Sequence, residues 1–159
     1  MGASSIEPDR DALRRALEAE ILAEIPLARA MGLSITGHDG ESVRLAAPLA
    51  PNINDKGCAF GGSLVSLMTV AGWALVRLAL DARGSACDIY VADSEVRYLA
   101  PVWQDFEVVA RLAEGEDFAS LFDGLATRGK GRCRVRCHVP LADGDAATLS
   151  ARFVAIART

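Results

Sequence analysis

The segment from Gly62 to Leu80 carries one charged residue, Arg77, and its apolar residues cover nearly every direction around a helical axis. A helix that is apolar on all sides either crosses a membrane or is enclosed by the rest of the protein. This segment approaches the length of a membrane span, but glycine, serine and threonine interrupt it, and no other segment resembles a span. We therefore predict a buried helix and no contact with a membrane. Only a sheet, alone or with neighbouring elements, can enclose such a helix.

Alternating apolar residues predict the strands of that sheet. Two strands are expected before the central helix, at 31–36 and 42–47, and four after it, at 88–99, 106–112, 132–139 and 149–155. Helical spacing predicts an amphipathic helix over 9–25, which Pro26 ends, and a short helix over 117–127. The expected fold class is therefore α+β, with an N-terminal helical extension at residues 1–25 and one domain at 26–159.

The composition excludes several classes of protein. A length of 159 residues fits one domain with a substantial core, and a formal net charge of −4 argues against a nucleic-acid-binding protein. The first ten residues lack the apolar core of a signal peptide, so we expect a cytoplasmic protein with reduced thiols. No Cys-x-x-Cys pair occurs, and Cys133 and Cys137 share one face of a predicted strand. We expect the cysteines to be buried apolar residues and predict no metal site.

A polar loop that contains glycine leads directly into the central helix at residues 52–63, which read Asn-Ile-Asn-Asp-Lys-Gly-Cys-Ala-Phe-Gly-Gly-Ser. The first N–H groups of a helix have no partner within it, and they lie at the positive end of the helix dipole. Such donors suit a carbonyl oxygen on which negative charge develops. A simpler interpretation stays open: Asn54 and Asp55 suit a turn or a cap, and Gly61 and Gly62 suit close helix packing.

Two motifs carry a resemblance to a known superfamily. Asn-Asp-Lys-Gly-Cys-Ala-Phe-Gly-Gly-Ser-Leu, from Asn54, is similar to the Asn-(five residues)-His-Gly-Gly pattern of hotdog-fold acyl-CoA thioesterases. Asp-Ser-Glu-Val-Arg-Tyr-Leu-Ala-Pro, from Asp93, is similar to a strand of the same proteins. The Phe-Gly-Gly-Ser-Leu variant most resembles a thioesterase domain that is appended to bacterial N-acetyltransferases. The resemblance covers residues 26–158 and implies a curved antiparallel sheet wrapped around the central helix, with a short helix between late strands.

The resemblance also implies catalytic roles for particular residues. Asn54 would orient the attacking water or the thioester, and the backbone N–H groups of Gly61 and Gly62 would stabilise the oxyanion. Thr69 stands where the related enzymes carry a catalytic Asp or Glu, which serves as nucleophile or general base. Asp93 resembles a second acidic position and could act instead. The residues alone also allow Thr69 to bond back to a carbonyl one turn earlier, and Asp93 to pair with a neighbouring arginine.

Further residues are expected to bind the substrate. They are Phe60, which occupies the histidine position of the related enzymes, and Asp55, Ser63, Ser94, Tyr98 and Arg132. Arg132, Arg134 and Arg136 alternate along one predicted strand, with Arg128 and Lys130 beside them. Such a basic face is usually a solvated surface, but the phosphates of CoA or of a phosphopantetheine carrier would also favour it.

The function that the resemblance implies is hydrolysis of an acyl-CoA or acyl-carrier-protein thioester, with no cofactor beyond the CoA or phosphopantetheine of the substrate. The alternative is a module that binds an acyl thioester or another hydrophobic small molecule without turnover, because Phe60 and Thr69 replace polar catalytic groups. Hydratase chemistry ranks lower, since the histidine that it uses is absent. The strand at 88–99 would leave a long open edge, so we expect it to pair with a second copy in a homodimer or a dimer of dimers.

Overall fold

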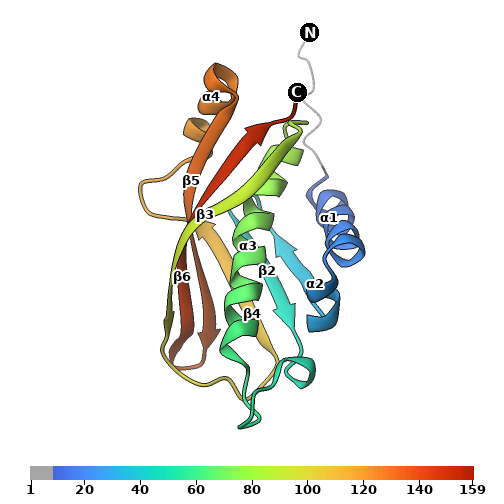
Figure 1. The fold of residues 1–159 in the computed structure, drawn as a ribbon, viewed down its shortest axis with the longest axis vertical. Coiled ribbons are helices and arrows are strands. Elements are labelled where there is room, and N and C mark those ends of the chain that lie inside the picture. Colours follow the sequence, from blue (N-terminus) through green and yellow to red (C-terminus); the bar gives the residue numbers. More distant parts are fainter. Residues whose placement is uncertain (1–8) are drawn as a thin grey trace.

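Six antiparallel strands form one curved sheet, and a single long helix lies along its concave face (Figure 1). The computed structural model describes residues 9–159. The long helix is α3, Gly61–Asp81. The strand order is β1-β2-β4-β5-β6-β3, with the bounds β1 Ser34–His38, β2 Ser42–Ala47, β3 Cys87–Tyr98, β4 Phe106–Leu112, β5 Lys130–Leu141 and β6 Gly144–Ala157. This arrangement confirms the predicted α+β hotdog fold.

The core lies between α3 and the inner face of the sheet. Along β5 the buried residues alternate with exposed ones, so that Cys133, Val135 and Cys137 lie on the inner face. The Cys137 thiol donates a hydrogen bond to the backbone carbonyl of Met68 at 3.3 Å, which places the two elements in direct contact. All four cysteines are free and buried, as their sequence positions predict.

The helix α3 is less completely enclosed than its composition suggests. The sheet covers one side, and at the far end Arg77 forms ion pairs with Glu20 at 2.8 Å and with Asp81 at 2.9 Å. Among residues 9–159, α3 is the one helix long and apolar enough to cross a membrane, and 56% of that stretch is buried by the rest of the chain. One stripe at helical spacing is only half-buried, and we call it the open stripe: Gly62, Val65, Ser66, Thr69, Val70 and Trp73.

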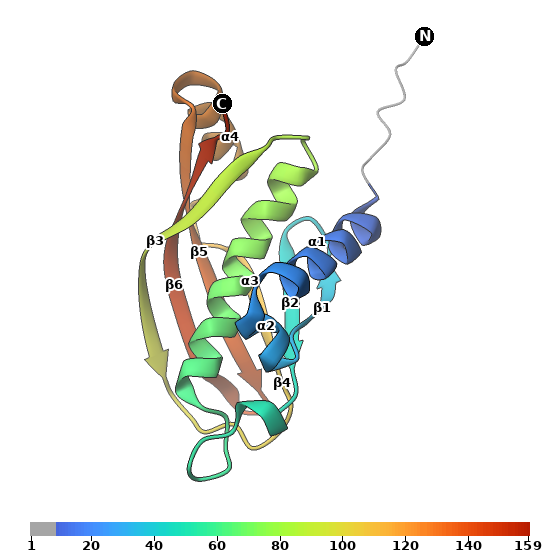
Figure 2. The same cartoon turned by 45° about the vertical axis from the view of Figure 1, so that its right-hand side comes forward.

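Two helices precede the sheet and flank α3 on the side away from β3 (Figure 2). In α1, Arg10–Glu24, the side chain of Asp9 accepts hydrogen bonds from the N–H groups at the helix start. Leu17 and Ile21 of α1 are buried in the same core as α3, so this helix is packed as part of the domain. Residues 1–8 of the predicted extension lie outside the described part of the chain.

A short helix after α1 corrects the sequence interpretation. Pro26 ends the first helix as predicted, but it also begins α2, Pro26–Met31, because proline suits the first position of a helix. Gly32 then ends α2 with a φ of 71°, a conformation that favours glycine. The predicted strand from residue 31 therefore starts too early, and β1 begins at Ser34.

The second short helix, α4 Phe118–Arg128, lies between β4 and β5 and packs against the start of β5. Its cap is Asp117, whose carboxylate accepts a hydrogen bond from the N–H of Ser120 at 2.7 Å. The strand β4 pairs with β5 only from Val135 onward, and α4 contacts the earlier residues of β5. A Cβ atom at Gly131 would lie 2.3 Å from the carbonyl of Leu121, so glycine is required for this contact.

The strand β3 forms one edge of the sheet. It pairs with β6 along its length, and within residues 9–159 no strand pairs with its other side. The register shifts between Val91 and Asp93, which marks a β-bulge. Before the bulge, Val91 pairs with the buried Phe153 and faces α3, whereas after it Asp93 pairs with Arg152 and lies on the outer face.

The packing of Gly72 generates a prediction about stability. A Cβ atom at this position of α3 would lie 2.8 Å from the ring of Phe153, which is buried. Although alanine favours a helix by about 1 kcal/mol over glycine, overpacking costs about 1–3 kcal/mol, so we expect Gly72→Ala to destabilise the protein. Urea denaturation checks this, and an unchanged or higher midpoint would show that the Phe153 ring moves aside without cost.

Candidate functional site

The loop before α3 is a small hairpin that a buried asparagine fixes in place. Ile53 and Ala59 form an antiparallel bridge, and the N–H of Phe60 donates to the carbonyl of Asn52 at 2.7 Å. The side-chain amide of Asn52, which is 2% exposed, donates to the carbonyl groups of Met31 at 2.9 Å and Pro48 at 2.7 Å. Sequence reasoning missed this role, because a polar residue next to a proline looks like an ordinary turn residue.

At the start of α3 two backbone donors are free. Phe60 precedes the helix and provides no side-chain cap, and its carbonyl accepts from the N–H groups of Ser63 at 2.9 Å and Leu64 at 3.1 Å. The N–H groups of Gly61 and Gly62 have no hydrogen-bond partner in the described chain, and both residues are half-buried. Because they lie at the positive end of the helix dipole, they can stabilise an oxygen that gains negative charge. The oxyanion role of the two glycines stays a prediction.

Two aromatic rings flank these donors. A Cβ atom at Gly61 would lie 3.3 Å from the ring of Tyr98, and one at Gly62 would lie 2.3 Å from the ring of Phe60. A Cβ atom at Gly62 would therefore force the Phe60 ring to move, whereas one at Gly61 would require the Tyr98 ring to shift only slightly. Tyr98 is 58% exposed and Phe60 is 56% exposed, so the rings border a surface that a ligand can reach. We call this set of four residues the helix-start site.

The predicted residues of the preceding loop lie beside this site and are engaged with each other. The side-chain oxygen of Asn54 accepts from the N–H groups of Lys56 at 2.8 Å and Cys58 at 3.2 Å, as in a turn. Asp55 is exposed and pairs with Lys56 at 3.0 Å. Phe60 of the helix-start site is hydrogen-bonded to Asn52. Asn54 is two residues beyond Asn52 on the same strand of the hairpin, so it lies about 7 Å farther from the site.

Two hydroxyl-bearing residues lie farther along. The hydroxyl of Thr69, on the open stripe, donates to the carbonyl of Val65 at 2.8 Å, so its oxygen keeps lone pairs that can accept a hydrogen bond. Thr69 is seven residues beyond Gly62, roughly 10 Å along the same side of the helix. On β3, Ser94 pairs with the buried Ala151, so it faces inward, and it is exposed.

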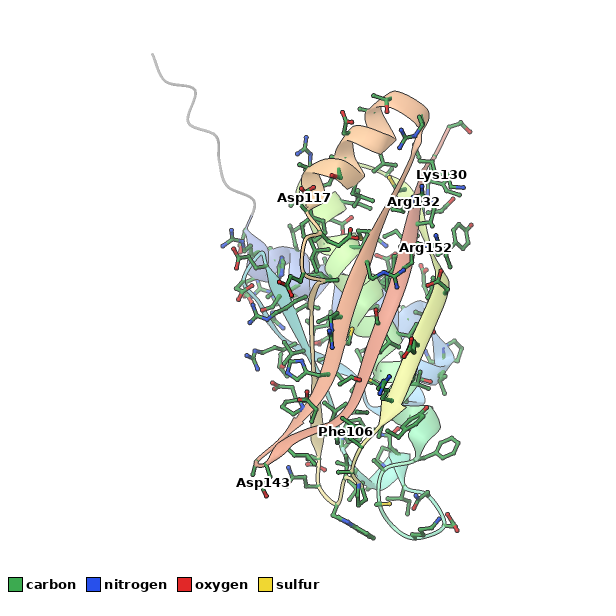
Figure 3. All side chains as sticks on the ribbon, turned by 90° about the vertical axis from the view of Figure 1, so that its left-hand side faces the viewer. Phe106, Asp117, Lys130, Arg132, Asp143 and Arg152 are labelled. Carbon is green, nitrogen blue, oxygen red and sulfur yellow. The ribbon has the colours of Figure 1, made fainter. Side chains whose placement is uncertain are left out.

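The structure does not bring Asp93 or Arg132 to the helix-start site. The carboxylate of Asp93 lies on the outer face, 2.8 Å from a guanidinium nitrogen of Arg152 and 3.9 Å from one of Arg134. It is five residues from Tyr98 along β3, or roughly 17 Å. Figure 3 shows Arg132 and Arg152 on the outer face near one end of the sheet, whereas α3 begins near the other end.

Other titratable groups lie away from the helix start. Burial raises the pKa values of the Cys133 and Cys137 thiols to about 12, so both stay protonated at neutral pH and are poor nucleophiles. His38 belongs to β1, the sheet edge opposite β3, and its burial lowers its pKa. Residues 9–159 contain no group of three or more His, Cys, Asp and Glu side chains that could hold a metal ion.

Comparisons with known proteins identify a family and solved structures of the same fold. The family model described as "Putative thioesterase (yiiD_Cterm)" matches residues 14–157. A solved structure of a protein of unknown function from Chlorobaculum tepidum TLS is 27% identical, with a TM-score of 0.87, and the match covers 94% of this chain and 97% of that one.

Two further solved structures carry the word thioesterase in their descriptions. A putative thioesterase from Shewanella oneidensis is 28% identical, with a TM-score of 0.81, and the match covers 92% of this chain and 99% of that one. A probable thioesterase from Pseudomonas aeruginosa is 23% identical, with a TM-score of 0.75 over 93% of this chain and 95% of its own, which shows likeness of fold alone.

The role of Asn52 can be tested by substitution. Asn52→Ala would remove the donor from the carbonyl group of Met31, where the hydrogen bond is buried, and from that of Pro48, where it is partly buried, so we expect a loss of about 1–3 kcal/mol in the free energy of unfolding. Asp55→Ala, in the same loop but exposed, serves as the control and should change this free energy by less than about 0.5 kcal/mol. Urea denaturation measures both, and equal effects of the two variants would contradict the assignment.

Proposed function

The chain belongs to the family described as "Putative thioesterase (yiiD_Cterm)", and from this membership we propose that it hydrolyses an acyl thioester of CoA or of a phosphopantetheine-bearing carrier. The observation that carries the proposal is the pair of unpartnered N–H groups at Gly61 and Gly62. They lie at the first turn of an apolar helix, beside the exposed rings of Phe60 and Tyr98. In the proposed complex the thioester carbonyl approaches both donors from that side.

The two donors would lower the barrier to attack on the thioester. When water adds to the carbonyl carbon and gives up a proton, the carbonyl oxygen becomes an oxyanion. The oxyanion then collapses, and the thiolate departs with the electrons of the C–S bond and takes up a proton, which leaves a carboxylic acid and a free thiol. In the proposed complex the N–H groups of Gly61 and Gly62 both donate to this oxygen. Donors fixed in place before the reaction stabilise the transition state more than they stabilise the substrate, and one such donor is commonly worth about a hundred- to a thousandfold in kcat.

The acyl chain would lie along the open stripe of α3. Val65 and Val70 supply apolar surface there, and the inward side of β3 adds Val91, which is 45% exposed. In the isolated chain these residues face solvent. When an acyl chain covers these residues, apolar surface of both the acyl chain and the protein is removed from water, which favours binding.

Hydroxyl and amide groups would position the attacking water. The lone pairs of Thr69 and the hydroxyl of Ser94 lie on the inner side of the sheet, and Asn54 can join them if it releases Cys58. The sequence-based proposal for Asp93 as general base requires it to leave Arg152 and cross the sheet. We therefore propose that hydroxyl and amide groups position the attacking water, and that the Asp93 carboxylate only forms ion pairs with Arg134 and Arg152.

A second copy of the chain would complete the site. The edge of β3 is free in the described chain, and apolar residues along it are exposed, including Tyr90, Val91, Tyr98 and Leu99. A long apolar edge strand tends to pair with another strand. Pairing of two β3 strands would extend the sheet, cover these residues and bring the two open stripes together, so we propose a homodimer.

One feature favours a second candidate function, that of a non-catalytic acyl-thioester binding module. Within residues 9–159 no carboxylate interacts with the helix-start site, and the nearest polar side chains already hold bonds to their own loop or helix. A protein of this kind would bind the thioester at the same donors and release it intact.

A matched pair of substitutions at Gly61 tests the catalytic proposal. Proline removes the N–H donor but is well suited to the first position of a helix, whereas alanine keeps the donor and adds the same Cβ atom beside Tyr98. We expect Gly61→Pro to lower kcat by about a hundred- to a thousandfold and Gly61→Ala by much less. The measurement is thiol release from acyl-CoA substrates of increasing chain length.

The outcomes of that assay separate the two candidate functions. Equal activity of the proline and alanine variants would contradict the role of the Gly61 donor. No turnover by the unsubstituted protein, together with saturable binding of an acyl-CoA, would support the binding module instead. Thermal melting of each variant shows whether α3 still forms.

The dimer is tested by a charge on the free edge. Val91→Lys places an ammonium group on the inner face beside the free edge, where the second copy would cover it, so we expect a monomer. Because Val91 also belongs to the proposed acyl surface, the mass and not the activity tests the dimer. Leu27→Lys, on the exposed side of α2, is the control and should stay dimeric. Light scattering reads the mass, which we expect to be twice that of the 16.8 kDa chain; a monomeric unsubstituted protein would contradict the proposal.

A further inference from the structure

A pocket lined by arginines lies on the outer face of the sheet, away from the helix-start site. Its volume is about 340 Å³, and its lining includes four arginines, Arg128, Arg132, Arg134 and Arg152, and one carboxylate, that of Glu116. Figure 3 shows Arg132 and Arg152 together with α4 near the same end of the sheet. The start of α3 lies near the opposite end of the molecule (Figure 1). The proposed hydrolysis therefore does not use this pocket within one chain.

Four guanidinium groups face two carboxylates, Glu116 in the lining and Asp93 beside it, so the positive charges of the pocket are only partly neutralised. Arg134 lies directly opposite Arg152 on the neighbouring strand, and like charges in such a pair destabilise a sheet. Both share Asp93, at 3.9 and 2.8 Å. Within residues 9–159, Arg128 and Arg132 form no ion pair, and the buried Nε–H of Arg152 has no hydrogen-bond partner. A bound anion would satisfy these donors in a chain whose net charge is −4.

We propose that this pocket binds the phosphate groups at the nucleotide end of a CoA thioester, and that it serves the helix-start site of the partner subunit. The inference rests on the proposed function and its dimer. Guanidinium groups bind phosphate through paired, charge-assisted hydrogen bonds, and several of them converge here. The volume lies within the range of small-molecule sites, so the pocket suits a nucleotide better than the broad surface of a carrier protein.

The symmetry of the dimer explains how the pocket reaches a distant site. Two β3 strands that pair with both α3 helices on one side of the sheet run antiparallel around a two-fold axis. The Tyr98 end of one β3 then lies beside the Cys87 end of the other. Arg132 neighbours Val154 of β6, which in turn neighbours Tyr90 of β3, so the pocket belongs to the Cys87 end.

The distances favour the partner's pocket over the chain's own. Within one chain Tyr98 is eight residues from Tyr90, roughly 26 Å along β3. Across the proposed dimer the partner's Arg132 lies about three strand spacings, roughly 15 Å, from the Tyr98 end. The two sites lie on opposite faces of the sheet, so the arm would pass around the strand ends, where the Tyr98 end of one β3 lies beside the Cys87 end of the other. An extended pantetheine arm can bridge the shorter distance by this route and not the longer one. The thioester would thus bind one subunit while its phosphates bind the other.

A double substitution tests the ligand. Arg128→Gln with Arg132→Gln removes two guanidinium groups that hold no ion pair, and Arg44→Gln, on another strand of the sheet, is the control for loss of charge. We expect the double variant to lower kcat/KM for an acyl-CoA by roughly ten- to a hundredfold and to leave that for the matching acyl-pantetheine within about twofold. The acyl-pantetheine lacks the diphosphate and the nucleotide.

A second measurement keeps this inference separate from the proposed function. Calorimetric titration with adenosine 3′,5′-bisphosphate should show binding to the unsubstituted protein and to Arg44→Gln, and at least about tenfold weaker binding to the double variant. Equal binding to all three proteins, or equal losses with both thioesters, would overturn the pocket assignment while hydrolysis stands. If no protein hydrolyses either thioester, the proposed function fails, and the titration still decides whether the pocket binds phosphate.

Mixed dimers test the claim that the pocket serves the partner. One subunit carries Gly61→Pro, which removes the donor, and the other carries the two arginine substitutions. If the site is shared between subunits, each mixed dimer holds one site in which an intact Gly61 donor faces an intact arginine pocket. Random exchange makes about half of the dimers mixed, so mixing the two impaired proteins should restore about a quarter of the unsubstituted protein's activity toward acyl-CoA. No recovery, in a mixture shown to exchange subunits, would overturn the shared site.

Discussion

The burial of α3 against the inner face of the sheet is the interaction on which the rest of the structure depends. Removing its apolar side chains from water supplies a large part of the free energy that holds the domain together. The same contact fixes the direction of the helix and therefore the position of its first turn. Asn52 holds the incoming loop from the other side. The free N–H groups of Gly61 and Gly62 are thus held in place without any side chain that caps them.

The sheet separates two kinds of chemistry. Its inner face is apolar and shapes the space beside α3, where an acyl chain could lie. Its outer face carries arginines on neighbouring strands, where phosphate could bind. Neither face alone could accommodate both ends of an acyl-CoA, which is apolar at one end and multiply charged at the other. The free edge of β3 joins the two functions, because a second copy paired there would bring the outer face of one chain near the helix start of the other.

The sequence was sufficient for the fold because its strongest patterns are long. The nearly uncharged run of α3 and the alternation of β5 each extend over many residues, so a single exception does not change the result. Local exceptions were not predictable. Pro26 both ends one helix and begins another. The bulge after Val91 decides on which face of the sheet Asp93 lies. Unbroken alternation would place the Asp93 side chain on the inner face, but the extra residue of the bulge places it on the outer face, next to Arg152. The role of Asn52 depends in part on the carbonyl group of Met31, which is 21 residues earlier in the chain.

The aromatic rings at the helix start have a consequence for how this protein can vary over evolutionary time. The polarising groups belong to the main chain, so almost any residue could in principle supply them. What restricts the two positions is steric: a β-carbon would lie 2.3 Å from the ring of Phe60 at Gly62 and 3.3 Å from the ring of Tyr98 at Gly61, so a ring would have to move, farther at Gly62 than at Gly61. Selection would therefore act on the rings and the glycines together, and a lineage that lost one ring could accept a bulkier neighbour without surrendering the donors.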